Sequence, residues 1–424
     1  MTPLEEARSL LQQGRMADAE KLFERALDTT PNDAQALNVV ALAALRNGNL
    51  PRAADLLIRA VTANPTDPLS HHHLGRVCDA AGDMQGALQA HARAVKLRPE
   101  FQVGRLFFGL SLHRAGQTQA ALLQLARTLN DAQSQGKWVD IQTTPAPLRP
   151  AVEQAVTLFR AGRRQALFQL LEPFARDHGR SELTRVEKCV RIYLREEPPE
   201  YPDPRQQPTF LFFPGLGASP YIDRSKLDWI PALEAQTDAI HAELMTLLPS
   251  AAGRERVFTT EELERQNLRG LDAPPSWTGY YFYRHGQRRD DNCAACPATA
   301  RALDALPLVR LREHGPEVLY SVFTPGTELL PHRGVTNTRL VGHLPLIIPE
   351  NCALDVGGEL HHWQPGRVVV FDDTYEHGAW NRSKETRVVM IFDTWHPDLT
   401  EVERSAVTAL VGYLGDFRKE MDAA

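Results

Sequence analysis

Two histidines in the C-terminal half of the sequence stand where they could bind one metal ion. His332 lies in the segment LPHRG, and His377 lies in the segment FDDTYEHGAW. Each follows a short run of residues that favours a β-strand, so the two imidazoles could converge from strand ends. Histidine is the commonest protein ligand of metals, although most histidines bind none. The spacing therefore makes a metal centre a hypothesis, with two ordinary structural histidines as the alternative.

The carboxylate that usually completes such a site is missing. In the common 2-His-1-carboxylate centre an Asp or Glu stands two residues after the first histidine. Here that residue is Gly334, which has no side chain to offer. Two interpretations follow: water takes the third position, or the site has lost its metal. Asp373, four residues before His377, could accept a hydrogen bond from a metal-bound water.

Two arginines nearby indicate an anion site. If TRLVGHL forms a strand, Arg339, Val341 and His343 share one face, because side chains alternate along a strand. Arg387 opens the later run TRVVMIF among apolar neighbours, where a guanidinium needs a carboxylate or phosphate partner. A small dicarboxylate that also chelates the metal would meet both demands. For Arg387 a salt bridge at the strand end is the alternative.

The elements that must position these residues are short strands. From about residue 316 the sequence contains β-branched runs bounded by Gly, Pro and Asn. They read VLYSVFTPG, TRLVGHLPLIIP, RVVVFDD and TRVVMIFDTW. Evenly spaced short strands predict a double-sheet barrel or jelly roll, whose inward-facing side chains can hold a ligand.

The N-terminal part repeats itself every 34 residues. The recurring residues are Gly14, Gly48, Gly82 and Gly116; Ala19, Ala53, Ala87 and Ala121; and Pro31, Pro65 and Pro99. Each unit predicts two helices, with a left-handed glycine ending the first and a proline ending the second. This pattern matches the tetratricopeptide repeat, of which roughly three and a half copies are visible. Within it, the consecutive residues His71, His72 and His73 are expected to be partly exposed on a helix.

The chain is therefore expected to be an α + β multidomain protein. The repeat domain, an α-solenoid, covers residues 1–130, and residues 131–200 form a linker with a further helical hairpin that turns at Gly162. The segment 196–208 carries five prolines and leads into a catalytic domain at 205–424.

Composition excludes some classes of function. The net charge of −6, from 53 acidic and 47 basic residues, argues against broad binding to nucleic acid or anionic membranes. We find no signal-peptide pattern and no apolar run long enough for a membrane span. The five cysteines are sparse, and the single CxxC pair, Cys293 and Cys296, lacks the second pair that a zinc ribbon needs. A reduced, cytoplasmic location is the expectation.

Longer motifs carry a family resemblance. The patterns PGTxxxPHxGxTNxRLxxHLxLxxP and FDDxxEHxxWN lie within a region, about residues 205–400, that resembles the aspartyl/asparaginyl β-hydroxylases. Vertebrate members of that family also carry tetratricopeptide repeats ahead of this domain. The resemblance implies a double-stranded β-helix (a jelly-roll or cupin-like fold) that uses Fe(II), 2-oxoglutarate and O2 to hydroxylate an aliphatic carbon.

The resemblance also assigns roles to single residues. It implies that iron is bound by two histidines, with a glycine in place of the carboxylate, and that an acidic residue stands behind the metal. The implied metal ligands are His332 and His377; the catalytic acidic residue is Asp373; the 2-oxoglutarate contacts are Ser321, His343, Arg387 and Tyr283; and the substrate contact is Arg339.

Two departures from the family pattern stand out. Val341 replaces a second substrate-binding arginine, and Ala300 stands where Cys293 would find a disulfide partner. The expected substrate is an Asp- or Asn-type residue in a peptide or protein presented by the repeats, and neither nucleic acid nor membrane is an expected partner. The alternatives are a non-peptidyl small molecule, halogenation at the missing ligand position, and a non-catalytic repeat scaffold.

Overall fold

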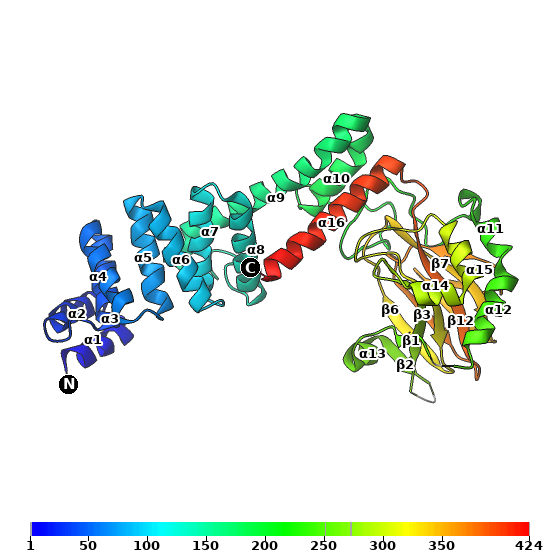
Figure 1. Ribbon diagram of the computed structural model, residues 1–424, viewed down its shortest axis with the longest axis horizontal. Helices are drawn as coiled ribbons and strands as arrows, with labels where there is room; N and C mark the ends of the chain where they lie inside the picture. Colours follow the sequence, from blue (N-terminus) through cyan, green and yellow to red (C-terminus); the bar gives the residue numbers. More distant parts are fainter. Residues whose placement is uncertain (1, 251, 272–273, 424) are drawn as a thin grey trace. The chain divides into compact units, whose positions relative to one another are not determined.

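The computed structural model describes residues 2–250, 252–271 and 274–423. The chain divides into two compact units, which are seen in Figure 1. The first comprises Met1–Ala166 with Gly415–Ala424, and the second comprises Leu167–Leu414. The division falls inside helix α9 (Arg149–His178), so the proline-rich segment 196–208 belongs to the second unit. Within the described ranges, none of the helices combines the length and apolar character that crossing a membrane requires.

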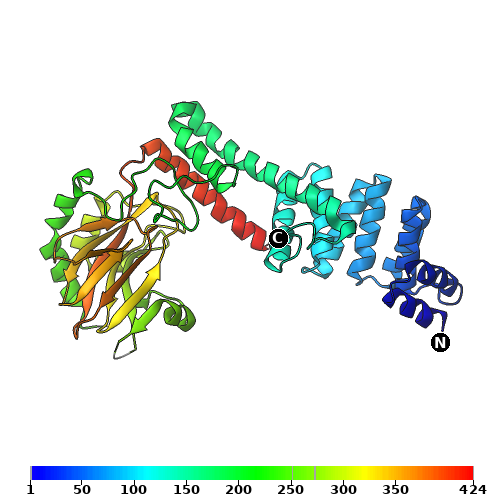
Figure 2. The same cartoon turned by 180° about the vertical axis from the view of Figure 1, so that it is seen from behind.

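The second unit is built on two antiparallel sheets (Figure 2). The larger has the order β1-β3-β5-β12-β7-β10, with β4 paired to β3, and the smaller has the order β2-β6-β11-β8-β9. The strands of the larger sheet are β1 (Arg254–Arg256), β3 (Trp277–Arg284), β4 (Gln287–Arg288), β5 (Val318–Phe323), β7 (Arg339–Ile347), β10 (Val369–Phe371) and β12 (Arg387–Trp395). Those of the smaller sheet are β2 (Leu268–Gly270), β6 (Thr327–His332), β8 (Cys352–Val356), β9 (Glu359–His361) and β11 (His377–Asn381).

Apolar side chains from both sheets form a common core. One cluster joins Phe323 and Val389 of the larger sheet to Leu354 and Ala379 of the smaller. A second cluster covers the other face of the larger sheet with helices. The helices of this unit are α10 (Thr184–Tyr193), α11 (Ile230–Glu234), α12 (Thr237–Leu247), α13 (Glu261–Asn267), α14 (Asp290–Ala295), α15 (Pro297–Asp304) and most of α16 (Glu401–Ala423). The strand runs expected from the sequence coincide with β5, β7, β10 and β12.

The first unit consists of paired helices that follow the 34-residue period. The pairs are α1 (Pro3–Gln12) with α2 (Met16–Thr29), α3 (Ala34–Arg46) with α4 (Leu50–Ala63), α5 (Pro68–Ala81) with α6 (Met84–Leu97), and α7 (Gln102–Arg114) with α8 (Thr118–Ser134). The recurring glycines have φ of 74° to 78°, as a left-handed helix end requires. The recurring alanines are buried, which lets paired helices approach closely.

One predicted turn is wrong. Gly162 was expected to end a helix, but it lies inside α9, which runs unbroken for 30 residues. A Cβ at this position would lie 2.5 Å from Leu122 Cδ2 of helix α8. The glycine therefore serves close packing between helices, and a glycine chosen for packing has the same sequence signature as one chosen for a turn.

His71 and His73 are partly exposed as expected, but His72, the middle histidine of the triplet, is buried. His72 is 3% exposed, and its ring packs against the rings of His91, Phe101 and Phe107. Burial lowers the pKa of His72 well below its ordinary value and, with Arg76, lowers that of His73 to about 4. These imidazoles are consequently neutral in the folded repeats at neutral pH.

Acidification should therefore unfold the repeat unit. Both histidines take up a proton in the unfolded chain below about pH 6.5 but resist protonation when folded, so stability is full above that pH. It should fall by up to about 1.4 kcal/mol per pH unit for each histidine as the pH drops towards 4. Urea denaturation, read by pulsed hydrogen exchange in α5 and α6, measures this slope. His72→Leu should flatten it and His71→Leu should not; equal slopes in the two variants would contradict the assignment.

Candidate metal and anion site

The two histidines predicted as ligands face each other. His332 ends β6 and His377 begins β11, and the antiparallel register of these strands places the two residues directly opposite. Their ring centroids are 4.1 Å apart. Such a pair projects from one face of the sheet, so both rings can reach a single ion.

Backbone contacts fix the orientation of both rings. Nδ1 of His332 is 3.0 Å from the carbonyl oxygen of Leu330, and Nδ1 of His377 is 3.0 Å from that of Tyr375. A carbonyl can only accept, so each Nδ1 carries the proton and each Nε2 presents a lone pair. Burial and the neighbouring His332 lower the pKa of His377 to about 4, which keeps its ring in the neutral form that metals bind.

Asp373 occupies the space that a side chain at position 334 would need. A Cβ on Gly334 would lie 2.1 Å from Cγ of Asp373, and the amide of Gly334 donates to the carbonyl of Asp373 at 2.6 Å. The glycine thus admits a carboxylate from a different loop. In the described part of the chain no three His, Cys, Asp or Glu residues are arranged to hold a metal together. Asp373 is therefore not arranged as a third ligand beside the histidine pair.

Arg339 is bound by two carboxylates. Its NH2 lies 2.7 Å from Oδ2 of Asp373, and its NH1 lies 3.4 Å from Oδ2 of Asp393. Burial would lower the pKa of Arg339, but the two carboxylates raise it above its ordinary value. Arg339 was predicted to contact substrate, and in this structure its guanidinium already holds Asp373 in place.

Aromatic contacts lead from the histidine pair into the space between the sheets. Phe371 on β10 packs against His377 with ring centroids 5.5 Å apart, and against His343 on β7 at 5.1 Å. His343 is 4% exposed, and burial together with Arg387 and His377 lowers its pKa well below its ordinary value. His343 therefore lies between the predicted metal ligands and the predicted anion site.

Arg387 is the main feature of that anion site. It is 1% exposed, and its guanidinium carbon lies 4.2 Å from the ring centre of Phe323 and 4.4 Å from that of Trp363. NH1 donates to Oγ of Ser321 at 3.3 Å. Among the described residues no carboxylate pairs with it, and burial lowers its pKa to about 9. A buried cation without a counter-ion is costly, which favours an anionic ligand here.

The aromatic residue beside this pocket is Trp277, and the assignment of Tyr283 is wrong. Nε1 of Trp277 donates to Oγ of Ser321 at 2.9 Å, and its ring packs on Phe323. Tyr283 lies at the other end of β3, opposite Val318 and beyond a register shift. The sequence WTGYYFYR offers aromatic residues at both ends of the strand, and the family resemblance alone had assigned the contact to Tyr283.

Sequence reasoning also missed Trp363. This residue lies in the loop between β9 and β10, where no strand pattern draws attention to it. It is 5% exposed and is in contact with both Arg387 and His343. A signal was present: a tryptophan between two predicted strands of a barrel is a candidate for covering an interior pocket.

Unsatisfied polar atoms gather at this site. Of the ten buried side-chain nitrogen or oxygen atoms without a hydrogen-bond partner in the described chain, half belong to residues of this site. They are Nε of Arg339, Nδ1 of His343, Nε1 of Trp363, Oδ1 of Asp373 and Nε of Arg387. Buried polar atoms are nearly always paired, so this concentration indicates a bound ligand that contributes both acceptors and donors.

A groove of about 720 Å³ reaches His377 from outside. It is lined by residues of β6, β11 and their flanking loops, including Leu330, Arg333, His377 and Trp380. Of the described residues that line it, none comes from β5 or β12, which carry Ser321 and Arg387. The site is therefore open beside His377 and enclosed around Arg387.

The cysteines form no bridge. Cys78, Cys189, Cys293, Cys296 and Cys352 are all free thiols. Cys293 and Cys296 are buried beside α14 and α15, and burial raises the pKa of both. They are structural members of the core that covers the larger sheet.

Comparison with known proteins identifies both regions of the chain. The family model described as Aspartyl/Asparaginyl beta-hydroxylase matches residues 234–397, and one described as Tetratricopeptide repeat matches residues 4–68. A solved tetratricopeptide-repeat protein, YrrB, aligns with 30% of this chain and 66% of its own at 22% identity and a TM-score of 0.28.

Curated relatives are similar to roughly half of the chain. Mouse aspartate beta-hydroxylase domain-containing protein 2 is 32% identical over 58% of this chain and 70% of that relative. Human aspartyl/asparaginyl beta-hydroxylase is 32% identical over 46% of this chain and 25% of its own length. The ornithine lipid ester-linked acyl 2-hydroxylase of Rhizobium tropici is 32% identical over 44% and 64%. Two of these three relatives are matched over less than two thirds of their length. The chain belongs to the aspartyl/asparaginyl beta-hydroxylase family and carries tetratricopeptide repeats ahead of the matched domain.

Proposed function

We propose that this chain is an Fe(II)- and 2-oxoglutarate-dependent dioxygenase that hydroxylates an aliphatic carbon. The observation that carries the proposal is the pair His332 and His377, with both Nε2 atoms free, beside a buried Arg387 that has no acidic partner among the described residues. One feature calls for a metal and the other for an anion. Family membership supports a hydroxylation.

The strand pairing supports a double-stranded β-helix as the fold of the second unit. Strand β8 pairs with β9, β7 with β10, β6 with β11, and β5 with β12. These are the nested pairs of one long hairpin. The further pairings of β12 with β7 and of β11 with β8 roll that hairpin into two sheets. A jelly roll of this kind encloses a ligand between its sheets.

The residues present fit iron and 2-oxoglutarate. His332 and His377 would hold the metal through Nε2, and Oδ1 of Asp373 would accept a hydrogen bond from a metal-bound water. Arg387 and Ser321 would bind one carboxylate of the co-substrate, and His343 would contact its other end. Trp277 holds the Ser321 hydroxyl from the opposite side.

When bound, iron supplies the oxidation: 2-oxoglutarate, O2 and a C–H group become succinate, CO2 and an alcohol. The protein positions the reactants and limits water. Phe323 and Trp363 flank Arg387, so water cannot screen its charge and the ion pair with a carboxylate is strong. Arg339 keeps the carboxylate of Asp373 oriented towards Gly334.

The substrate that we propose is a peptide or protein presented by the repeat region, because tetratricopeptide repeats generally bind such partners. A second candidate is a non-peptidyl molecule such as an acyl chain. Two observations favour this candidate. Asp373 and Asp393 already balance the charge of Arg339, and the next inward position holds the apolar Val341. One relative is named for hydroxylating a lipid.

Two alternatives have less support. Halogenation would need room for a halide at the missing ligand position, and the carboxyl group of Asp373 fills the space beside Gly334. Detection of a chlorinated product in turnovers with added chloride would support halogenation instead. A non-catalytic scaffold would not need the unsatisfied polar atoms that surround the site.

The proposed metal ligands can be tested by following the turnover of 2-oxoglutarate in the absence of the substrate that is hydroxylated. Purified protein with Fe(II), 2-oxoglutarate and O2 should release succinate slowly, and His332→Ala or His377→Ala should lower that rate by at least about 100-fold, more than outer-shell changes do. Succinate is quantified by mass spectrometry. His314→Ala, at an exposed histidine of the same unit, is the control. Equal rates in wild type and His377→Ala would refute the ligand assignment.

Replacement of Arg387 should separate stability from ligand binding. Arg387→Met removes a buried cation without a counter-ion, so the ligand-free protein should be as stable or more stable, by on the order of 1–3 kcal/mol. Wild type should gain about 2.7 kcal/mol from 2-oxoglutarate at a hundred times its Kd, and the variant should gain nothing. Chemical denaturation of the second unit reports both values.

The matched control for this experiment is Arg382→Met. Arg382 also stacks on a tryptophan, Trp380, with 4.4 Å between guanidinium carbon and ring centre, but it is paired with Glu328. Its replacement should leave the response to 2-oxoglutarate intact. An Arg387→Met protein that is still stabilised by 2-oxoglutarate would contradict the proposed co-substrate site.

A further inference from the structure

A segment ahead of the matched family domain touches both loops that carry the predicted metal ligands. This segment, residues 206–213, is called the strap; it lies before residue 234, where the family match begins. The amide of Thr209 donates to the carbonyl of Gly334 at 3.1 Å, and that of Leu211 donates to the carbonyl of Val335 at 2.9 Å. Leu211 also forms a parallel bridge with Thr336. The strap thus pairs with the chain that follows β6, directly after His332.

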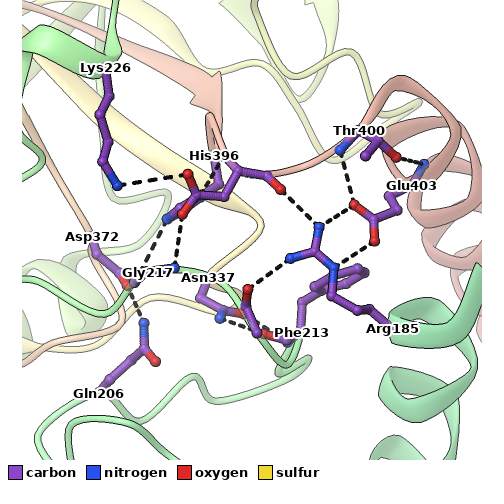
Figure 3. A network of polar contacts seen from close by, with 12 residues as sticks. Arg185, Gln206, Phe213, Gly217, Lys226, Asn337, Asp372, His396, Thr400 and Glu403 are labelled. Carbon is purple, nitrogen blue, oxygen red and sulfur yellow. Dashed lines mark hydrogen bonds and ion pairs between the residues drawn. The ribbon is translucent and has the colours of Figure 1, made fainter. Parts of the chain in front are cut away.

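Asn337 fastens the end of the strap. Its Oδ1 accepts from the amide of Phe213, and its Nδ2 donates to the carbonyl of the same residue, both at 2.8 Å (Figure 3). Asn337 is 1% exposed, and the Phe213 side chain is fully buried. The asparagine therefore gives the strap the two hydrogen bonds that a neighbouring strand would provide, at a point where no water competes.

The other end of the strap holds the loop before His377. Nε2 of Gln206 donates to Oδ2 of Asp372 at 2.6 Å, a contact drawn in Figure 3. The amide of Gln207 donates to the carbonyl of Thr374 at 3.0 Å. The same loop supplies the Tyr375 carbonyl that orients His377. Gln206 and Asp372 are both buried, so this contact is shielded as well.

The chain that follows the strap is itself anchored. Arg185 of α10 donates to the carbonyls of Gly215 and Asp398, both at 2.8 Å, and pairs with Glu403 of α16 at 2.5 Å. Nε2 of His396 lies 3.2 Å from the carbonyl of Gly217. Figure 3 shows these contacts as one connected network within the second unit. The strap is thus held at its far end by groups outside the two loops.

We propose that the strap sets the spacing of the two histidine loops, and that Asn337 and Gln206 are positioning residues for His332 and His377. The inference rests on the proposed function, since it assigns the strap to the metal site. The loops also meet directly, through the backbone hydrogen bond of Gly334 with Asp373 and through the ion pair of Arg333 with Glu376. A metal site with two histidine ligands has no carboxylate to help fix its geometry. A third segment that binds both loops supplies an additional constraint.

The test compares Mn(II) affinity in the full chain among Asn337→Ala, Gln206→Leu and a matched control. The control is Asn292→Ala, which also loses a side-chain hydrogen bond to a backbone carbonyl, that of Tyr281, away from the strap. The two strap variants should bind Mn(II) 10- to 100-fold more weakly than wild type, the range typical of residues that orient metal ligands. The control should bind like wild type. Unchanged affinity in both strap variants would overturn the inference.

A second measurement separates this inference from the proposed function. Hydrogen exchange of the metal-free protein is compared in segments 333–337 and 372–376, which carry the backbone groups that the strap contacts. Each strap variant should speed exchange in both segments, including the one that the altered residue does not touch. If wild type binds no Mn(II), the proposed function is contradicted. The hydrogen-exchange rates of the metal-free protein still test whether the strap holds the two loops. Exchange that rises only beside the altered residue, or equally in Asn292→Ala, would refute it.

Discussion

The backbone pairing of β6 with β11 sets the distance between the two imidazoles, and the other site residues are arranged around that pair. Because His332 lies directly opposite His377, a slip of one residue would turn one ring away from the other. Gly334 lets the loop after β6 approach Asp373 more closely than any other residue could. The register and the glycine together produce a site with two facing imidazoles, which we propose as metal ligands, and a carboxylate packed against Gly334.

Two arginines in the same sheet differ in their electrostatic surroundings. Arg339 is held between Asp373 and Asp393, so its charge is balanced within the protein. Arg387 is buried between aromatic rings, and among the described residues it donates to the Ser321 hydroxyl and has no carboxylate to balance its charge. This difference explains why we place the co-substrate at Arg387. It also implies that the ligand-free fold tolerates a destabilising group for the sake of binding, as functional sites often do.

Much of this arrangement follows from sequence, and the exceptions have physical causes. The period of 34 predicted the repeats and the β-branched runs predicted four strands of the larger sheet, because both patterns are local. The smaller sheet was harder, since β11 reads HGAWN and shows no β-branched alternation. Tyr283 was assigned from the family resemblance, but β3 carries aromatic residues at both ends and it is Trp277 that contacts Ser321. The contacts of the strap with both loops join residues more than a hundred positions apart, and no local pattern encodes them.

The central claim is that two imidazoles, without a carboxylate, bind the metal. Pulsed electron paramagnetic resonance of the Mn(II)-loaded protein measures it most directly, because it counts the imidazole nitrogens coupled to the ion. We predict two coupled imidazole nitrogens in wild type. Either single histidine variant should show one coupled nitrogen or bind no Mn(II), and Asp373→Asn should still show two. A wild-type count other than two, or a count of two that persists when His332 or His377 is replaced, would contradict this account.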